Sequence, residues 1–243
     1  VAQAQARLQS REATLLSGSA ARVSGNNAWT VPFHAVSPAN HWALFARAYF
    51  DRYGVGEEQL GWVAVNARAN AAHNPNAIYR EPLTIEDYLS SRMISSPLRL
   101  YDCDTHIDGS TALVISHRDA AKDCANPPIH IEAMGMSLGG LGQGIHVGDF
   151  TTLPATKAGD MLWQRTDLTA KNVSCAQIYD GFSIHVWLWG EALGLWQPGE
   201  AAHFFEGGTR TGIGGELPVN TGGGQLSGGR FHGYGHTHEA CLQ

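Results

Sequence analysis

The sequence predicts an α/β fold, because segments typical of strands alternate with segments typical of helices along its second half. In the first half, apolar side chains recur at three- and four-residue spacing in Pro38–Tyr53 and Glu57–Asn74, the pattern of helices that cover a core. Polar residues such as Tyr179 and Asp180 stand where a predicted strand ends. Ligands in such sheets collect at the carboxyl ends of strands, so we expect the functional site there.

The boundaries of the N-terminal elements follow from local signals. Pro38 opens the first helix and Gly54 ends it. Thr84 and the acidic residues after it predict a capped helix start. Gln3–Leu16 is expected to be helical, and the aromatic segment Ala28–His34 is expected to be extended.

Three apolar runs predict strands, at Asp108–Ser116, Ile129–Met134 and Cys175–Asp180. Further helices are expected over 119–123, 153–165, 182–195 and 200–207. Asn126-Pro127-Pro128 is the strongest linker signal in the chain. We therefore place a domain boundary there and expect two domains, 1–126 and 127–243.

Composition excludes several classes of function. Charged residues make up 16% of the 243 residues and the formal net charge is -6, so the basic surface of a nucleic-acid binder is missing. No apolar run approaches the roughly 20 residues of a membrane span. The four cysteines lack CxxC spacing, which favours a reduced, cytoplasmic setting. The chain lacks an initiator Met and ends inside a predicted helix, so we expect a fragment of a longer protein.

A glycine-rich loop over 219–233 is the most unusual stretch of the chain. Glycine is used where the backbone needs a positive φ or where another group must touch the main chain. His236–Leu242 follows it as the predicted start of a helix. The loop N–H groups would then favour an anion or a developing oxyanion, so we interpret the loop as half of an active site.

Tyr179, Asp180 and His232 are the candidate catalytic residues. Tyr179 is a weak base at its reference pKa of about 10 unless cations or hydrogen bonds lower that value. His236 and His238, with Cys241 and His232, leave a zinc site open, although no acidic ligand stands at a fixed spacing. The G-x-S-x-G run at 135–139 leaves a hydrolase open, although the glycines after it are poor helix formers.

Three motifs in order resemble those of the thiolase superfamily, closest to the lipid-transfer-protein or sterol-carrier-protein-x type. Asp108-Gly109-Ser110-Thr111-Ala112 resembles its D-G-A-A-A strand, and Tyr179-Asp180-Gly181-Phe182 occupies the place of its N-E-A-F or H-D-C-F element. Its glycine motif, N-x-x-G-G-x-x-x-x-G-H-P-x-G, is matched at Asn220, Gly223, Gly224, Gly229 and Gly233. The histidine of that motif falls on Arg230. The tyrosine in Y-D-x-F resembles the related steroid side-chain retro-aldolases.

The resemblance implies a thiolase-like α/β fold of two similar βαβαβαββ halves, with the first half incomplete. It implies a homodimer acting on an acyl-CoA thioester in lipid or steroid side-chain metabolism, by acyl transfer or retro-aldol cleavage, with no cofactor, no metal and a small OB-fold partner protein. Tyr179 would be the general acid/base beside Asp180 and His232, and Gly223, Gly224, Gly229 and Arg230 would bind the thioester. Trp29 and Phe33 would line the acyl pocket. The alternative is a non-catalytic acyl-CoA or lipid-binding subunit.

Overall fold

The computed structural model describes residues 27–138 and 153–243, which belong to two compact units, Val1–Ser37 and Pro38–Gln243. The described part of the first unit holds helix α2 (Asn27–Thr30) and the 3₁₀ helix η1 (Val31–Phe33). The prediction of an extended segment here was wrong. Pro32 sits in the first turn of η1, where its missing N–H costs no hydrogen bond. The helix expected over 3–16 lies outside the described residues.

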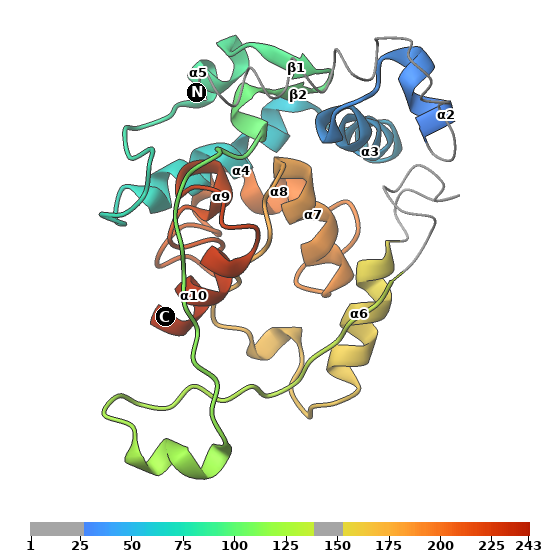
Figure 1. Ribbon diagram of the computed structural model, residues 1–243. Coiled ribbons are helices and arrows are strands. Elements are labelled where there is room, and N and C mark those ends of the chain that lie inside the picture. The colour runs from blue at the N-terminus through green and yellow to red at the C-terminus, as the bar shows by residue number, and fades with distance from the viewer. Residues whose placement is uncertain (1–26, 139–152) are drawn as a thin grey trace, which may run out of the picture. The chain divides into compact units, whose positions relative to one another are not determined.

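Four helices form the core of the second unit: α3 (Pro38–Tyr53), α4 (Glu57–Ala71), α7 (Ser183–Ala192) and α8 (Ala201–Phe205). Figure 1 shows α4 and α8 next to α7, with α4 continuing toward α9. All four helices were predicted from the sequence, and α3 has the bounds that Pro38 and Gly54 indicate. Helix α7 is apolar on every side, as a helix enclosed by others must be.

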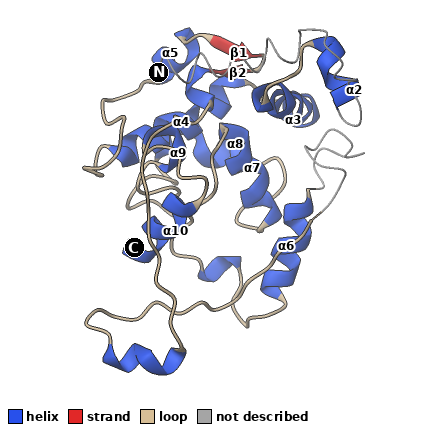
Figure 2. Cartoon of the chain, in the orientation of Figure 1, coloured by secondary structure: helices blue, strands red, loops and turns tan. Residues whose placement is uncertain are grey.

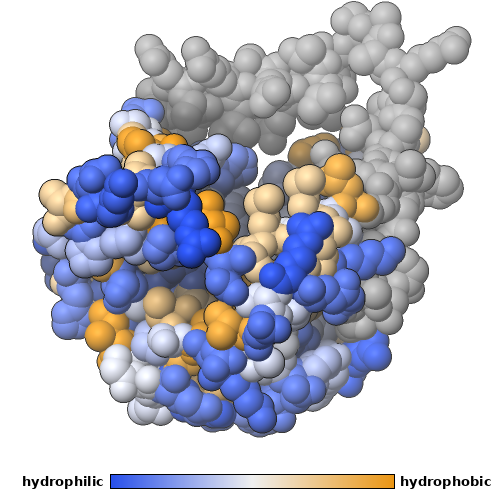
Figure 3. Space-filling view, turned by 90° about the horizontal axis from the view of Figure 1, so that it is seen from below, coloured by the Kyte–Doolittle hydropathy of each residue, from blue (hydrophilic) through white to orange (hydrophobic). Residues whose placement is uncertain are grey.

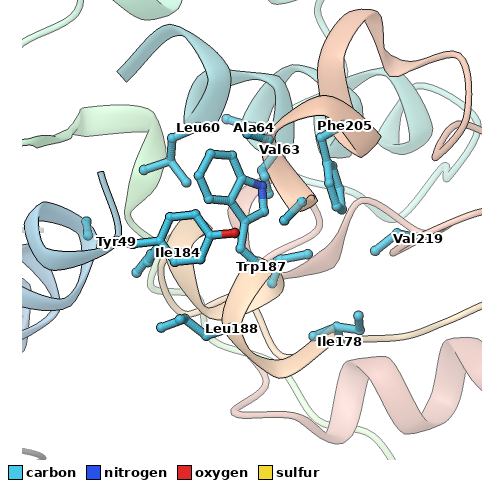
Figure 4. Packing of buried hydrophobic residues seen from close by; sticks show 14 of the residues in the cluster. Tyr49, Leu60, Val63, Ala64, Ile178, Ile184, Trp187, Leu188, Phe205 and Val219 are labelled. Atoms are coloured by element: carbon cyan, nitrogen blue, oxygen red, sulfur yellow. The ribbon is translucent and has the colours of Figure 1, made fainter. Parts of the chain in front are cut away.

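Trp187 lies at the centre of this core and is fully buried (Figure 4). Leu60, Val63 and Ala64 of α4 approach its indole from one side, and Tyr49 of α3 from another. The Tyr49 ring centroid is 5.2 Å from that of Trp187. Buried aromatic side chains of this size dominate core energetics, so this contact holds α3, α4 and α7 together.

A short hairpin follows the four-turn helices. Helix α5 (Ile85–Ser90) begins at Thr84, whose hydroxyl accepts the Asp87 N–H, as predicted. Strands β1 (Met93–Ser95) and β2 (Leu98–Arg99) then pair antiparallel and lead into η2 (Leu100–Asp102). They are the two strands of regular structure among the described residues (Figure 2).

The strands predicted at Asp108–Ser116 and Ile129–Met134 are wrong as described: both segments are extended but unpaired, with the 3₁₀ helix η3 (Arg118–Asp123) between them. Val114 is 95% exposed and Ile131 is 71% exposed. Their apolar sequences suit a sheet interior, but a strand needs a neighbour to take its backbone hydrogen bonds. None of the described segments lies beside them in that way.

The segment after η3 runs along helix α6 (Pro154–Trp163), as the green and yellow ribbons of Figure 1 show. Arg165 donates a 2.8 Å hydrogen bond to the Met134 carbonyl, and the Gly135 backbone approaches Ala158 so closely that a Cβ would lie 1.9 Å from its oxygen. Helix α6 confirms the helix expected over 153–165. The G-x-S-x-G run itself ends at Gly139, outside the described residues.

The remaining elements are short. The 3₁₀ helices η4 (Ala170–Asn172) and η5 (Glu206–Gly208) flank α7 and α8 in sequence, and α9 (Gly224–Ser227) and α10 (Tyr234–Leu242) end the chain. The face in Figure 3 is mostly hydrophilic, with separate apolar patches. Within the described ranges, no helix has the length and apolar character needed to cross a membrane.

The buried carboxyl group of Asp102 makes the stability of this unit depend on pH. Burial raises the pKa of Asp102 to about 6, although the Arg99 N–H and the Tyr88 hydroxyl each donate to its Oδ2 at 2.7 Å. The nearby Glu57 also raises this pKa. Because the folded pKa exceeds the unfolded value of 3.8, the folded state binds this proton more tightly than the unfolded state does. The stability that protonated Asp102 contributes is therefore fully present below about pH 4 and is lost as pH rises through 6.

We expect the Asp102→Asn variant to lose this dependence on pH. At about 1.4 kcal/mol per pKa unit, the free energy of unfolding of the wild type should fall by about 3 kcal/mol from pH 4 to pH 7 on account of this group. Urea titrations at several pH values measure it, with the exposed Asp51→Asn as control. Parallel pH profiles for Asp102→Asn and the wild type would contradict the expectation.

Candidate active site

Two segments that are distant in sequence meet beneath the glycine-rich loop. Ala176 donates its N–H to the Pro218 carbonyl and accepts the Asn220 N–H, both at 2.9 Å. The Asn220 side chain extends this pairing, because it accepts the Ile178 N–H at 2.7 Å and donates to the Ile178 carbonyl at 2.9 Å. The strand expected over Cys175–Asp180 is thus a single parallel bridge with an asparagine amide as its second rung.

A row of asparagines fixes the loop to α4. The side-chain amide of Asn66 donates to the Thr211 carbonyl, that of Asn70 to the Val219 carbonyl and that of Asn74 to the Gly222 carbonyl. Asn66 and Asn70 are four residues apart and share one face of α4, and Asn74 lies just beyond the end of that helix. Sequence reasoning missed this row because it followed only the apolar positions. The i, i+4, i+8 spacing of asparagines in an alanine-rich helix was the signal available.

Asp180 is the polar centre of the site and is fully buried. Its carboxylate accepts the N–H groups of Gln225 at 2.7 Å and Leu226 at 3.3 Å, in the first turn of α9. Nε2 of the buried His236 donates to the same carboxylate at 2.9 Å. Helix N-termini favour negative charge, so the carboxylate satisfies N–H groups that would otherwise face a ligand. The structure thus gives Asp180 contacts within the protein that connect the bridge, the loop and α10.

The glycines predicted to bind substrate allow close packing within the protein. Gly224 has φ +57, and a Cβ there would lie 1.9 Å from Oδ2 of Asp180. Gly223 has φ +94, and a Cβ would lie 2.5 Å from that of Ala71 on α4. At Gly229, φ is +113. Side chains rarely adopt these φ values, so both backbone conformation and space require glycine here.

Tyr179 and His232, predicted as catalytic residues, are brought together by the structure. The Tyr179 hydroxyl lies 3.1 Å from His232 Nδ1, and the His232 side chain is exposed. The Tyr179 ring packs 5.2 Å from Trp189 and 6.2 Å from His236, between ring centroids. The phenol is therefore held by aromatic contacts while its oxygen faces an exposed imidazole. This arrangement can transfer a proton between the two groups and a bound molecule.

His185 packs against the ring of Tyr179, with 5.6 Å between the ring centroids. Burial lowers the pKa of His185 to about 3, so its imidazole is neutral at physiological pH. It stacks on Trp189 with a 5.0 Å centroid separation and a 4° angle between the rings, and its Nδ1 accepts the Phe182 N–H. Tyr179 therefore rests on an uncharged aromatic surface. This role could not be predicted from the sequence, because His185 lies in a strongly apolar helix.

Arg230 is held in an ion pair at the edge of the site. Its Nε lies 3.2 Å from Oδ2 of Asp104, and its Nη1 donates to Nε2 of His106 at 3.2 Å. The Arg230 N–H also donates to the Thr105 carbonyl. Burial raises the pKa of Asp104, and the Arg230 guanidinium opposes that rise. Part of the charge of Arg230 is thus neutralised within the protein. Its role in thioester binding stays a prediction.

A cavity of about 360 Å³ lies between the glycine loop and α10. Its polar lining includes Gln225 and His236, which bond to Asp180. Gln177, Glu239 and His238 also line it and lie outside that network. Phe231 and Leu242 supply apolar surface. A mixed lining of this size suits part of an organic ligand rather than a bare ion.

The remaining candidates are two aromatic residues, a metal site and a cysteine nucleophile. Trp29 and Phe33 belong to the first unit, the side chain of Trp29 is outside the described part, and their role in an acyl pocket stays a prediction. In residues 27–138 and 153–243, no three His, Cys, Asp or Glu side chains are grouped as metal ligands. Burial raises the pKa of the Cys103 thiol to about 12, so it is not an activated nucleophile.

Several known proteins are similar to this chain in sequence. Residues 143–243 match the family model described as thiolase C-terminal domain-like. The chain is 38% identical over 214 residues to a steroid side-chain-cleaving aldolase of Thermomonospora curvata, covering 85% of this chain and 54% of that protein. It is 34% identical over 232 residues to the 17-hydroxy-3-oxo-4-pregnene-20-carboxyl-CoA lyase of Mycobacterium tuberculosis, covering 90% and 58%. This chain therefore spans little more than half of those relatives.

Solved structures agree with the sequence matches. A structure titled Ltp2-ChsH2(DUF35) aldolase superposes with a TM-score of 0.83 at 36% identity, over 92% of this chain and 60% of the other. A monomeric SCP2-thiolase-like protein from Mycobacterium smegmatis gives a TM-score of 0.62 at 15% identity, over 85% of this chain and 45% of the other. The α/β thiolase-like fold expected from the sequence is confirmed by these matches.

Gly224 offers a direct test of the packing around Asp180. Gly224→Ala should destabilise the protein through its positive φ, by about 1–2 kcal/mol, and through the clash with Asp180, by about 1–3 kcal/mol more. Gly214→Ala is the matched control, because Gly214 has φ +83 and open space around its Cβ position. Urea unfolding measures both variants. Equal losses of stability would show that the contact with Asp180 does not restrict this position.

Proposed function

This chain belongs to the thiolase superfamily, and we propose that its protein cleaves or forms the bond between the α and β carbons of an acyl-CoA thioester by aldol chemistry. The observation that carries the proposal is the Tyr179 hydroxyl placed 3.1 Å from His232 Nδ1 on an aromatic support. The relatives named as a steroid side-chain-cleaving aldolase and a CoA lyase support it. A bulky lipid or steroid acyl group is the substrate class that we infer from them.

The reaction can be written with its protons and electrons balanced. A base removes the proton of the β-hydroxyl group, the carbon–oxygen bond becomes a carbonyl, and the bond between the α and β carbons breaks. The electron pair passes to the thioester as an enolate, which takes up a proton at its α carbon. Tyr179 would exchange these protons, with His232 as the hydrogen-bonded partner of its hydroxyl.

Asp180 has a positioning role in this proposal. Its oxygens are occupied by two backbone N–H groups and by His236, and it is fully buried. It therefore acts on a substrate through the residues that it holds in place. Arg230 would add positive charge at the edge of the site, where the enolate and the thioester bear negative charge.

The alternatives to aldol chemistry are acyl transfer and non-catalytic binding of an acyl-CoA. Acyl transfer requires a reactive thiolate, and the partly buried Cys103 and Cys175 have pKa values raised by burial. A non-catalytic acyl-CoA-binding subunit is favoured by one observation, the presence of Arg230 where the thiolase glycine motif has its histidine. We also propose a partner protein with a small OB fold, and the related two-component Ltp2-ChsH2(DUF35) aldolase supports the presence of a partner. A homodimer in the cytoplasm is a further part of the proposal.

Tyr179→Phe tests this proposal most directly. Removing one hydroxyl should lower kcat for cleavage of a β-hydroxyacyl-CoA by about 10²–10⁴-fold, the usual contribution of a general acid–base group, while acyl-CoA binding is kept. Tyr79→Phe is the control, because Tyr79 is an exposed tyrosine whose ring stacks on Arg68 and keeps that contact as Phe. Release of the shortened acyl-CoA is measured by chromatography. Unchanged turnover in Tyr179→Phe would remove the role of Tyr179, and binding without turnover in the wild type would favour the binding subunit.

A further inference from the structure

Asp104 is a shielded acid beside the site to which the proposed reaction gives no role. Its side chain is 10% exposed, and its Oδ2 lies 3.2 Å from Nε of Arg230. Its N–H donates to the Gly181 carbonyl at 3.3 Å. The Tyr179 ring covers Gly181 so closely that a Cβ there would lie 2.9 Å from the Tyr179 hydroxyl oxygen. One backbone hydrogen bond thus connects Asp104 to the residue next to the proposed acid–base group.

Arg230 is anchored by three consecutive residues, Asp104, Thr105 and His106. The Thr105 carbonyl accepts the Arg230 N–H at 2.9 Å, the Asp104 carboxylate faces Nε, and His106 Nε2 accepts from Nη1 at 3.2 Å. A guanidinium has five N–H donors in one plane, so contacts at Nε and Nη1 also fix the direction of Nη2. Nη2 has no hydrogen-bond partner among the described residues, and the side chain is 31% exposed. Arg230 therefore keeps donors that a ligand can meet, in a fixed direction.

The charges around Asp104 favour this anchored state. Burial raises the pKa of the Asp104 carboxyl, and Arg230, followed by His106 and His232, lowers it. The buried Asp180 is a second acid, and it raises this pKa. A carboxylate that is nearly enclosed is costly without a cation beside it, so Asp104 and Arg230 each stabilise the charge of the other. Without this ion pair, the long and partly exposed Arg230 side chain would gain freedom to turn toward solvent.

We propose that Asp104 is a positioning residue, which acts through Arg230 to direct the free edge of the guanidinium toward the thioester oxygen that becomes the enolate oxygen. The inference rests on the proposed function for its ligand. Donors aimed at a developing charge contribute most in the transition state, where that charge is largest. Loss of the alignment should therefore lower kcat while KM stays nearly constant. A residue that only stabilises the fold would change neither value per folded molecule.

A double-mutant cycle in the complete protein tests whether Asp104 acts through Arg230. Asp104→Asn keeps the shape of the side chain without its charge, and should lower kcat for cleavage of a β-hydroxyacyl-CoA about tenfold, with KM within about twofold of the wild-type value. Arg230→Gln should lower kcat about 10²-fold. The double variant should be no slower than Arg230→Gln, since the residue through which Asp104 acts is gone. A loss of about 10³-fold in the double variant, the product of two independent effects, would overturn the inference.

Arg230→Lys separates alignment from charge. Lysine keeps one positive charge but has no planar fork, so it cannot contact Asp104 and His106 and also present a donor in a fixed direction. We expect kcat of Arg230→Lys to lie within about threefold of the Arg230→Gln value. Wild-type kcat in Arg230→Lys would show that a positive charge suffices, and would overturn the role of Asp104. This result holds even where Asp104→Asn fails to fold.

Asp104→Glu and Asp108→Asn are the matched controls. Glutamate keeps a carboxylate that reaches Nε, so kcat should stay within about threefold of the wild-type value. Asp108 lies further along the same segment, is exposed and has no ion pair in the described ranges, so Asp108→Asn should leave kcat unchanged. A loss in either control equal to that in Asp104→Asn would overturn the assignment to the Asp104 carboxylate. Circular dichroism gives the folded fraction by which each kcat is corrected.

The outcomes separate this inference from the proposed function. Turnover in the wild type with unchanged kcat in Asp104→Asn would keep the aldol proposal and overturn the role of Asp104. A wild type that binds acyl-CoA without turnover would remove the aldol proposal, and with it the enolate that Arg230 is proposed to meet. A loss of about tenfold in Asp104→Asn that disappears in the Arg230→Gln background would support both.

Discussion

The buried carboxylate of Asp180 is the interaction on which the rest of the site depends. It joins three segments that are far apart in sequence, because it accepts hydrogen bonds from the first turn of α9 and from His236 on α10 while its own backbone follows the bridge at Ala176. A buried carboxylate is costly unless its hydrogen bonds are complete, so the three donors have little freedom to move. The orientation of His236, and with it the character of the cavity wall, follows from this one group.

The glycine loop is shaped by a second constraint, its close contact with α4. Asn70 on that helix and Asn74 just beyond its end donate to loop carbonyls, and Ala71 leaves only enough room for a glycine at position 223. The loop therefore has its conformation before any ligand arrives. Preorganised polar groups lose little freedom on binding, which is what the proposed enolate would require of its site. In the proposed reaction the glycines would act indirectly, by letting Asp180 and α4 approach the backbone.

The sequence predicted the helices well and the strands poorly, for a physical reason. Pro38, Gly54 and Thr84 are local signals, so α3 and the start of α5 could be placed from neighbouring residues alone. A strand depends on a distant partner, and the apolar run at Ile129–Met134 has none among the described residues. The proximity of Tyr179 to His232 was expected from motif order. The neutral state of His185 could not be, because burial sets it.

The fully buried acids of this unit show why a motif alone does not assign a role. Asp102 and Asp180 have no exposed surface, and both accept backbone N–H groups. Asp102 has a tyrosine as its side-chain donor and lies within the packed core. Asp180 has as its side-chain donor His236, a residue that lines the cavity. Only the second arrangement connects the carboxylate to a residue on a cavity wall. The position of the histidine therefore separates a structural acid from one that organises a binding site.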